Sequence, residues 1–117
     1  MNTPLPYARD RREKMVLGRI LVVARDQQER DDLEKLLLDA KYDARAVGDV
    51  MGAYWMLRGF PAALVLLDGR LPREDRDELR TVLGIEPRLR GVRILALDAS
   101  LEPEETLERV REALARG

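Results

Sequence analysis

The chain has 117 residues, a formal net charge of -1 and a hydrophobic fraction of 45%, which suit one globular domain with a sizeable core. A protein that binds the phosphate backbone of nucleic acid normally carries a clear basic excess, and the absence of cysteine and histidine excludes disulfides, thiol chemistry and histidine-based catalysis. No apolar stretch approaches the ~18 residues that cross a membrane and no secretory signal is evident, so we expect a cytoplasmic protein.

Residues 1–18 are predicted to form an N-terminal tail of mixed charge, and residues 19–117 to form one folded domain. Within this domain, short apolar runs are typical of buried strands, and apolar stripes at i, i+3, i+4 and i+7 are typical of helices. We predict strands over residues 20–24, 43–47, 62–67 and 92–97. We predict four helices. Asp26 caps the first and Asp49 the second, the third starts at about Asp75 and the fourth at Pro103.

This alternation of strands and helices predicts an α/β three-layer sandwich with a mainly parallel sheet. Ligands in such folds gather beyond the carboxyl ends of the strands, which here are residues 24–26, 68–70 and 98–100. Asp68 is the most informative of these residues. It ends an apolar run and delivers a carboxylate into a loop, which is the layout of a phosphoacceptor aspartate. At the first helix, Asp26 followed by Glu29 also suits a capping box.

Residues 19–117 resemble the receiver domain of bacterial two-component response regulators, which has a flavodoxin-like fold. The resemblance rests on residues 19–23, on residues 64–68 together with Leu71-Pro72, and on residues 103–105 at the start of the last helix. It implies that Asp68 stands at the phosphoacceptor position. The family's fourth helix and fifth strand have no counterpart, because residues 98–102 run almost directly into the last helix.

The resemblance also implies that the residues that assist phosphorylation are missing. The family's acidic, magnesium-binding pair aligns with Ala24 and Arg25, and Asp26 comes one residue late, where it is expected to cap a helix. The family's serine or threonine aligns with Asp98, whose carboxylate would repel a phosphoryl group, and the family's lysine has no counterpart. We therefore expect a degenerate receiver, or pseudo-receiver, in which Asp68 is vestigial and which holds no metal and no cofactor.

Two interpretations of the function remain open at this stage. The first is a non-enzymatic domain that acts through protein–protein contacts in bacterial signalling without aspartyl phosphorylation. The second is a phosphate-accepting receiver that uses Asp68 with atypical helper residues. For the first, we hypothesise that Arg25 forms a salt bridge with Asp68 or Asp98 in place of the lost metal; the alternative is that Arg25 extends into solvent.

Two surfaces are candidates for partner binding, so we expect a protein partner or a homodimer, and neither nucleic acid nor a membrane. On the second helix Met51 and Trp55 are predicted to project outward, and tryptophan is a favoured hot-spot residue. Alternatively, Trp55 packs against the tail or a neighbouring helix. The strand at 92–97 becomes an edge of the sheet and invites pairing with a second chain, unless the last helix or the tail covers it.

Overall fold

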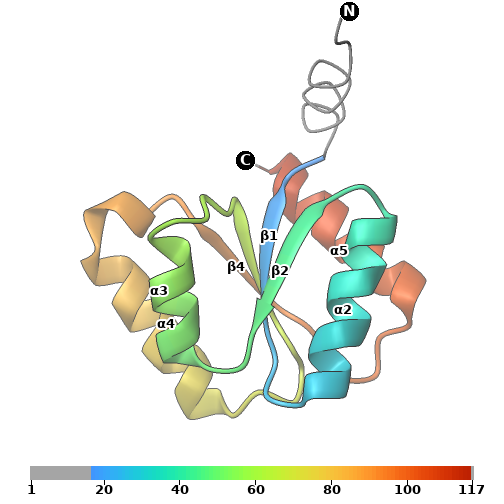
Figure 1. Ribbon diagram of the computed structural model, residues 1–117, viewed down its shortest axis with the longest axis horizontal. Coiled ribbons are helices and arrows are strands. Elements are labelled where there is room, and N and C mark those ends of the chain that lie inside the picture. Colours follow the sequence, from blue (N-terminus) through green and yellow to red (C-terminus); the bar gives the residue numbers. More distant parts are fainter. Residues whose placement is uncertain (1–16, 117) are drawn as a thin grey trace, which may run out of the picture.

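The computed structural model describes residues 17–116, so the predicted tail lies outside the described residues except for Leu17 and Gly18. Within residues 17–116, four strands alternate with four α-helices (Figure 1). The strands are β1 (Arg19–Val23), β2 (Asp43–Val47), β3 (Leu64–Leu67) and β4 (Arg93–Ala96). The helices are α2 (Gln27–Asp39), α3 (Val50–Leu57), α4 (Arg73–Ile85) and α5 (Pro103–Ala115), with a short 3-10 helix, η1 (Pro87–Leu89), before β4.

The four strands form one parallel sheet in the order β2-β1-β3-β4. Because the chain first moves from β1 to β2 and then back across the sheet, its right-handed crossovers place helices on both faces. Figure 1 shows α3 and α4 on one side of the sheet and α2 and α5 on the other. The predicted three-layer, flavodoxin-like fold is therefore confirmed. β4 leads through residues 97–102 directly into α5, so within residues 17–116 the fourth helix and fifth strand of the receiver pattern are missing, as predicted.

The sheet separates two apolar cores, and β1 contributes to both. Leu21 and Val23 pack with α3 and α4, whereas Ile20 and Val22 pack with α2 and α5. All four side chains are fully buried, which explains why the sequence of this strand is continuously apolar rather than alternating. None of the described helices is long and apolar enough to span a membrane.

The predicted helix starts are partly confirmed. The Asp26 carboxylate accepts a hydrogen bond from the Glu29 N–H at 3.0 Å, so Asp26 caps α2 as expected. Glu29 does not complete a capping box, because its carboxylate instead forms an ion pair with Arg70. Helix α4 begins at Arg73 rather than at about Asp75, since Pro72, with a φ of -57°, already has a backbone suited to a helix start.

Candidate functional site

The parallel pairing of the strands determines the neighbours of Asp68. Its N–H donates to the Val23 carbonyl at 3.0 Å, and the Leu97 N–H donates to the Leu67 carbonyl at 2.9 Å. The register of β1, β3 and β4 therefore continues for one residue and places Ala24 and Leu97 on the two sides of Asp68. The Asp68 residue is only 6% exposed, and both lateral neighbours are apolar and buried.

The face to which Asp68 points follows from the alternation along β3. Leu64 and Leu66 pack with α2 and α5, so the alternation directs Asp68 to the same side of the sheet. Within residues 17–116, the Asp68 carboxylate takes part in no ion pair. The acid at the expected phosphoacceptor position is thus well placed by the fold but lacks a charged partner in the described part of the chain.

Arg25 binds a different acid from the two that we expected. Its Nη2 atom lies 3.3 Å from Oδ2 of Asp75, on helix α4, so the hypothesis of a salt bridge to Asp68 or Asp98 is wrong. The reason is the period of two along a strand: Arg25 follows Ala24 and therefore points toward the α3 and α4 side, away from Asp68. Arg25 also does not simply extend into solvent.

A second ion pair crosses the first. Nη1 of Arg70, in the loop after β3, lies 3.0 Å from Oε2 of Glu29 on helix α2. Arg25 joins the loop after β1 to α4, the helix that follows β3. Arg70 joins the loop after β3 to α2, the helix that follows β1. Both arginine side chains are more than half exposed, so each pair contributes at most about 1 kcal/mol to the free energy of unfolding. The two cations nearest in sequence to the site are therefore each paired with an acid other than Asp68.

Arg30 is a feature of this edge that sequence reasoning missed. Its Nη1 atom donates to the carbonyl of Ala24 at 2.9 Å and to the carbonyl of Arg25 at 2.8 Å. The same atom lies 2.8 Å from where a Cβ on Gly48 would stand, so the glycine leaves room for the guanidinium. Arg30 thus fixes the loop after β1 and occupies the space between this loop and the loop after β2. In the sequence it looks like an ordinary surface residue of an amphipathic helix.

Asp98 is engaged in its own turn. Its Oδ1 atom accepts from the Ser100 N–H at 3.0 Å and from the Ser100 Oγ at 2.9 Å. These two hydrogen bonds lower the pKa of the exposed Asp98 carboxyl below its ordinary value, and the bond from the Ser100 N–H has the larger effect. Asp98 therefore stays ionised, and its charge lies in the loop that follows β4.

Gly69 allows the loop after β4 to lie directly against the loop after β3. A Cβ at residue 69 would lie 2.3 Å from the backbone nitrogen of Ala99 and 2.8 Å from the carbonyl carbon of Asp98. Gly69 has no positive φ, so the requirement for glycine is steric rather than conformational. The residue after Asp68 is thus in backbone contact with the β4–α5 loop.

The loop after β1 offers Asp68 few oxygen ligands for a magnesium ion. Magnesium requires a near-octahedral set of oxygen ligands, usually including one or two carboxylates. Beside Asp68 the loop after β1 presents the methyl group of Ala24 and then the guanidinium of Arg25, which is held by Asp75. Among residues 17–116, no group of three or more acidic, histidine or cysteine side chains is placed to hold a metal.

The candidate partner surface on α3 is exposed as predicted. Met51 is 60% exposed and Trp55 is 59% exposed, while Val50, Ala53 and Leu57 on the same helix are buried. The Trp55 ring meets the ring of Tyr54 edge-on at 5.5 Å, and the guanidinium of Arg58 lies 5.2 Å from its centroid. With more than half of its surface exposed, Trp55 is not buried beneath a neighbouring described helix.

Solved structures similar to this one include receiver domains. The chemotaxis response regulator CheY4 of Vibrio cholerae is 15% identical with a TM-score of 0.75, over 84% of this chain and 99% of that chain. The receiver domain of a sensor histidine kinase from Pseudomonas aeruginosa, solved with magnesium coordinated in its active-site cleft, is 18% identical with a TM-score of 0.74, over 84% of this chain and 98% of that chain.

The N-terminal domain of a response regulator receiver protein from Methanoculleus marisnigri is 28% identical, with a TM-score of 0.64, over 80% of this chain and 77% of that chain. No protein-family model matches the sequence, and no curated protein does either. The chain therefore has the fold of the receiver domains of two-component signalling.

Replacing Gly69 by alanine should destabilise the protein. The added methyl group would overlap the backbone at Ala99, so the loop after β4 must move, and overpacking of this kind costs about 1–3 kcal/mol. Gly84→Ala is the matched control, because a Cβ there meets nothing within 4 Å and alanine favours a helix by up to ~1 kcal/mol. Urea unfolding measures both changes. Equal stability of the two variants would contradict the close packing at Gly69.

Proposed function

We propose that residues 19–117 form a degenerate receiver, or pseudo-receiver, that acts in the bacterial cytoplasm through protein–protein contacts, without enzymatic activity and without phosphorylation of Asp68. The observation that carries this proposal is the surroundings of Asp68. Ala24 lies beside it in the sheet, and Arg25 is paired with Asp75 on the other side. In this proposal Asp68 is a vestigial phosphoacceptor, and Ala24, Arg25, Asp26 and Asp98 are the altered positions of the acidic pocket.

The chemistry of phosphoryl transfer supports the proposal. Transfer to a carboxylate depends on cations that neutralise the oxygens of the transferring group, most often a bound metal and a basic side chain. Asp68 has apolar neighbours on both adjacent strands, and Asp98 adds a negative charge in the loop after β4. An incoming phosphoryl group would thus meet additional negative charge without a metal to offset it.

The rival function is a receiver that accepts phosphate on Asp68 with atypical helpers, and one observation favours it. The ion pairs of Arg25 and Arg70 are largely exposed, so either guanidinium could leave its partner at a cost of about 1 kcal/mol or less. A guanidinium can bind phosphate oxygens in two-point fashion, but it does not bridge acceptor and phosphoryl group as a metal does.

Acetyl phosphate or beryllofluoride, each with magnesium, should leave the protein unchanged. Without metal ligands beside Asp68, we expect no phosphorylated species in the intact mass and no shifts in the amide NMR spectrum. The double variant Ala24→Asp, Arg25→Asp puts the acidic pair of the receiver pattern into the loop after β1 and removes the Arg25–Asp75 ion pair, and we expect it to gain magnesium-dependent shifts. An acyl-phosphate on the unmodified chain that is lost in Asp68→Asn would establish the rival function.

The α3 surface of Met51 and Trp55 is our candidate for the partner contact. A large aromatic side chain that is more than half exposed can bury much apolar area on binding. Arg58, stacked on the Trp55 ring, adds a positive charge at the edge of this surface. A partner that covers Trp55 would therefore gain both apolar burial and a charged contact.

Trp55→Ala should weaken the proposed partner contact by about 2 kcal/mol or more, the loss typical of a hot-spot residue. Its effect on unfolding should be small, because the side chain is exposed. The intact chain and the variant are each immobilised and incubated with a bacterial cell extract, and the amounts of the captured proteins are compared. Leu38→Ala, an exposed apolar residue on the opposite helical layer, serves as control. The same proteins captured in the same amounts by both variants would remove Trp55 from the contact.

We also propose a homodimer through the edge of β4. The Arg93 and Leu97 N–H groups donate to carbonyls of the β3 segment, so the alternate N–H groups of Ile94 and Ala96 point to the open side of the sheet. In the described part of the chain β4 is the last strand of the sheet, so no described strand pairs with it on that side. A second copy related by a two-fold axis perpendicular to the sheet would pair antiparallel with β4 and satisfy these N–H groups.

Ala96→Pro should convert this dimer to a monomer, because proline removes a donor from the open edge and leaves the pairing with β3 intact. Light scattering over a range of concentrations measures the mass of the unmodified chain and of the variant. Leu38→Ala, which leaves the edge unchanged, should remain a dimer. If the unmodified chain stays monomeric at high concentration, the proposed edge-paired dimer is excluded.

A further inference from the structure

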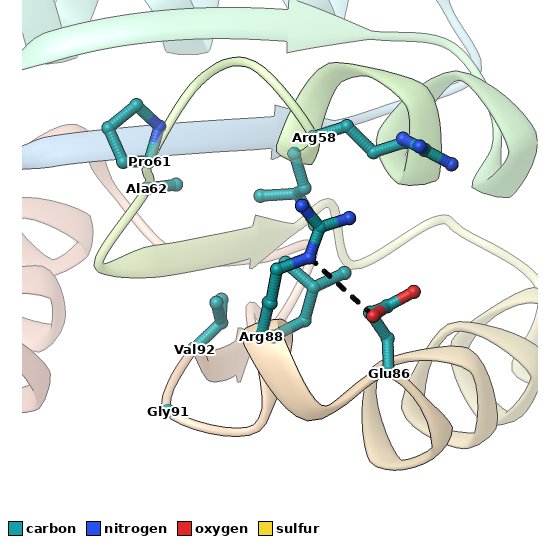
Figure 2. Close-up of a pocket in the computed structure, with 9 residues that line it drawn as sticks. Arg58, Pro61, Ala62, Glu86, Arg88, Gly91 and Val92 are labelled. Atoms are coloured by element: carbon teal, nitrogen blue, oxygen red, sulfur yellow. Dashed lines mark ion pairs between the residues drawn. The ribbon is translucent and has the colours of Figure 1, made fainter.

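A second candidate site lies at the opposite end of the sheet from Asp68. A pocket of about 300 Å³ opens where α3 ends, where β3 and β4 begin and where η1 turns (Figure 2). Ala62 precedes β3 and Val92 precedes β4, so the pocket is at the amino ends of these strands. Its volume is at the small end of the range for ligand pockets and suits one or two side chains rather than a large cofactor.

The floor of the pocket is apolar and is part of the protein core. Leu57, Ala62 and Leu89 line it, and each is no more than 7% exposed. All three belong to the core cluster beneath α3 and α4, so the floor is held by packing on its inner side. A rigid apolar floor of this kind can bury an apolar side chain of a ligand without reorganisation of the protein.

The rim of the pocket carries arginine. Figure 2 shows Arg88 reaching from η1 toward the end of α3, with Glu86 beside it. The Arg88 Nε atom lies 3.7 Å from Oε1 of Glu86, and the Arg88 side chain is 68% exposed. This contact uses one nitrogen of the guanidinium, and the two terminal nitrogens form no other ion pair among residues 17–116. Those nitrogens have the planar geometry that binds a carboxylate at two points.

The residues that line the pocket carry a second arginine, Arg58, and one acid, Glu86. The segment that supplies Arg88 also contains Arg90 and Arg93, which do not line the pocket. Arg58 pairs with no acid in the described part of the chain; its guanidinium rests on Tyr54 and Trp55. This local basic excess stands out in a chain whose net charge is -1.

We propose that this pocket binds an acidic peptide segment of a partner protein. One apolar side chain of the segment fills the floor at Leu57, Ala62 and Leu89, and a neighbouring carboxylate binds the guanidinium of Arg88. The inference rests on the proposed function in taking a protein as the ligand, and it names the chemical class of the bound segment. It does not depend on whether Asp68 is phosphorylated, because the two sites lie at opposite ends of the sheet.

The test uses peptides selected on the full chain. A display library of random peptides is panned on the immobilised protein, and the most enriched peptide, labelled with a fluorophore, is titrated against the protein and its variants. We expect enriched sequences to combine an apolar residue with aspartate or glutamate. We expect the affinity to fall about tenfold when the acids of the peptide are replaced by lysine.

Four variants separate the pocket from other surfaces. Arg88→Glu should weaken binding about tenfold, and Glu86→Gln should strengthen it, because the acid that competes for Arg88 is removed. Gly91→Leu should block the pocket without disturbing the fold, since a Cβ there meets nothing within 4 Å. Arg111→Glu on α5 makes the same charge change away from the pocket and should leave binding unchanged.

Two outcomes would overturn the inference. Peptides whose binding is lost in Trp55→Ala but unaffected by Arg88→Glu and Gly91→Leu would place the contact on α3 and exclude the pocket. Failure to enrich any peptide would also exclude it as a site for such segments. Neither outcome decides the proposed function, which stands or falls on the separate experiments with magnesium and with captured partners.

Discussion

The register of the parallel strands is the constraint on which the chemistry of this molecule depends. It places Ala24 and Leu97 beside Asp68, so the buried acid has a methyl group and an isobutyl group as its lateral neighbours. The alternation of faces along a strand then decides which charges can reach the acid. Arg25 follows Ala24 and therefore contacts Asp75 on the other helical layer. Because neighbouring residues of a strand point to opposite faces, Arg25 is separated from Asp68, the acid that it was expected to neutralise.

The loops around Asp68 are held by side-chain contacts and by one close approach of two backbone segments. The ion pairs that cross between the loops and helices are exposed, and each contributes at most about 1 kcal/mol. Gly69, by contrast, lies against the backbone of Ala99, and Arg30 binds two carbonyls of the loop after β1. The close approach of the two backbones at residue 69, unlike the side-chain contacts, cannot be exchanged for another contact by rotating a side chain. This close approach supports our proposal that the domain acts as a scaffold rather than as a switch.

Local features of the sequence were sufficient for the fold and insufficient for the site. The apolar run before Asp68 and the cap at Asp26 act over a few residues, so the strand and the helix start could be predicted. The short helix η1 was not predicted, and Glu29 was assigned to a capping box although Arg70 binds it across the fold. The roles of Arg30 and Gly69 likewise depend on segments far apart in the chain. A single sequence carries no local signal for contacts of this kind, even where the strand order is known.

The missing fifth strand connects the two proposed interaction surfaces. Since β4 is at the edge of the sheet, its open N–H groups begin at Ile94, two residues from Val92 in the wall of the arginine-rimmed pocket. In an antiparallel pair, Ile94 of one copy lies opposite Ala96 of the second copy, so Val92 at the pocket wall lies opposite Asp98 of the second copy. A partner segment that extends from the pocket along β4 would use the same N–H groups as the second copy and would therefore compete with edge pairing.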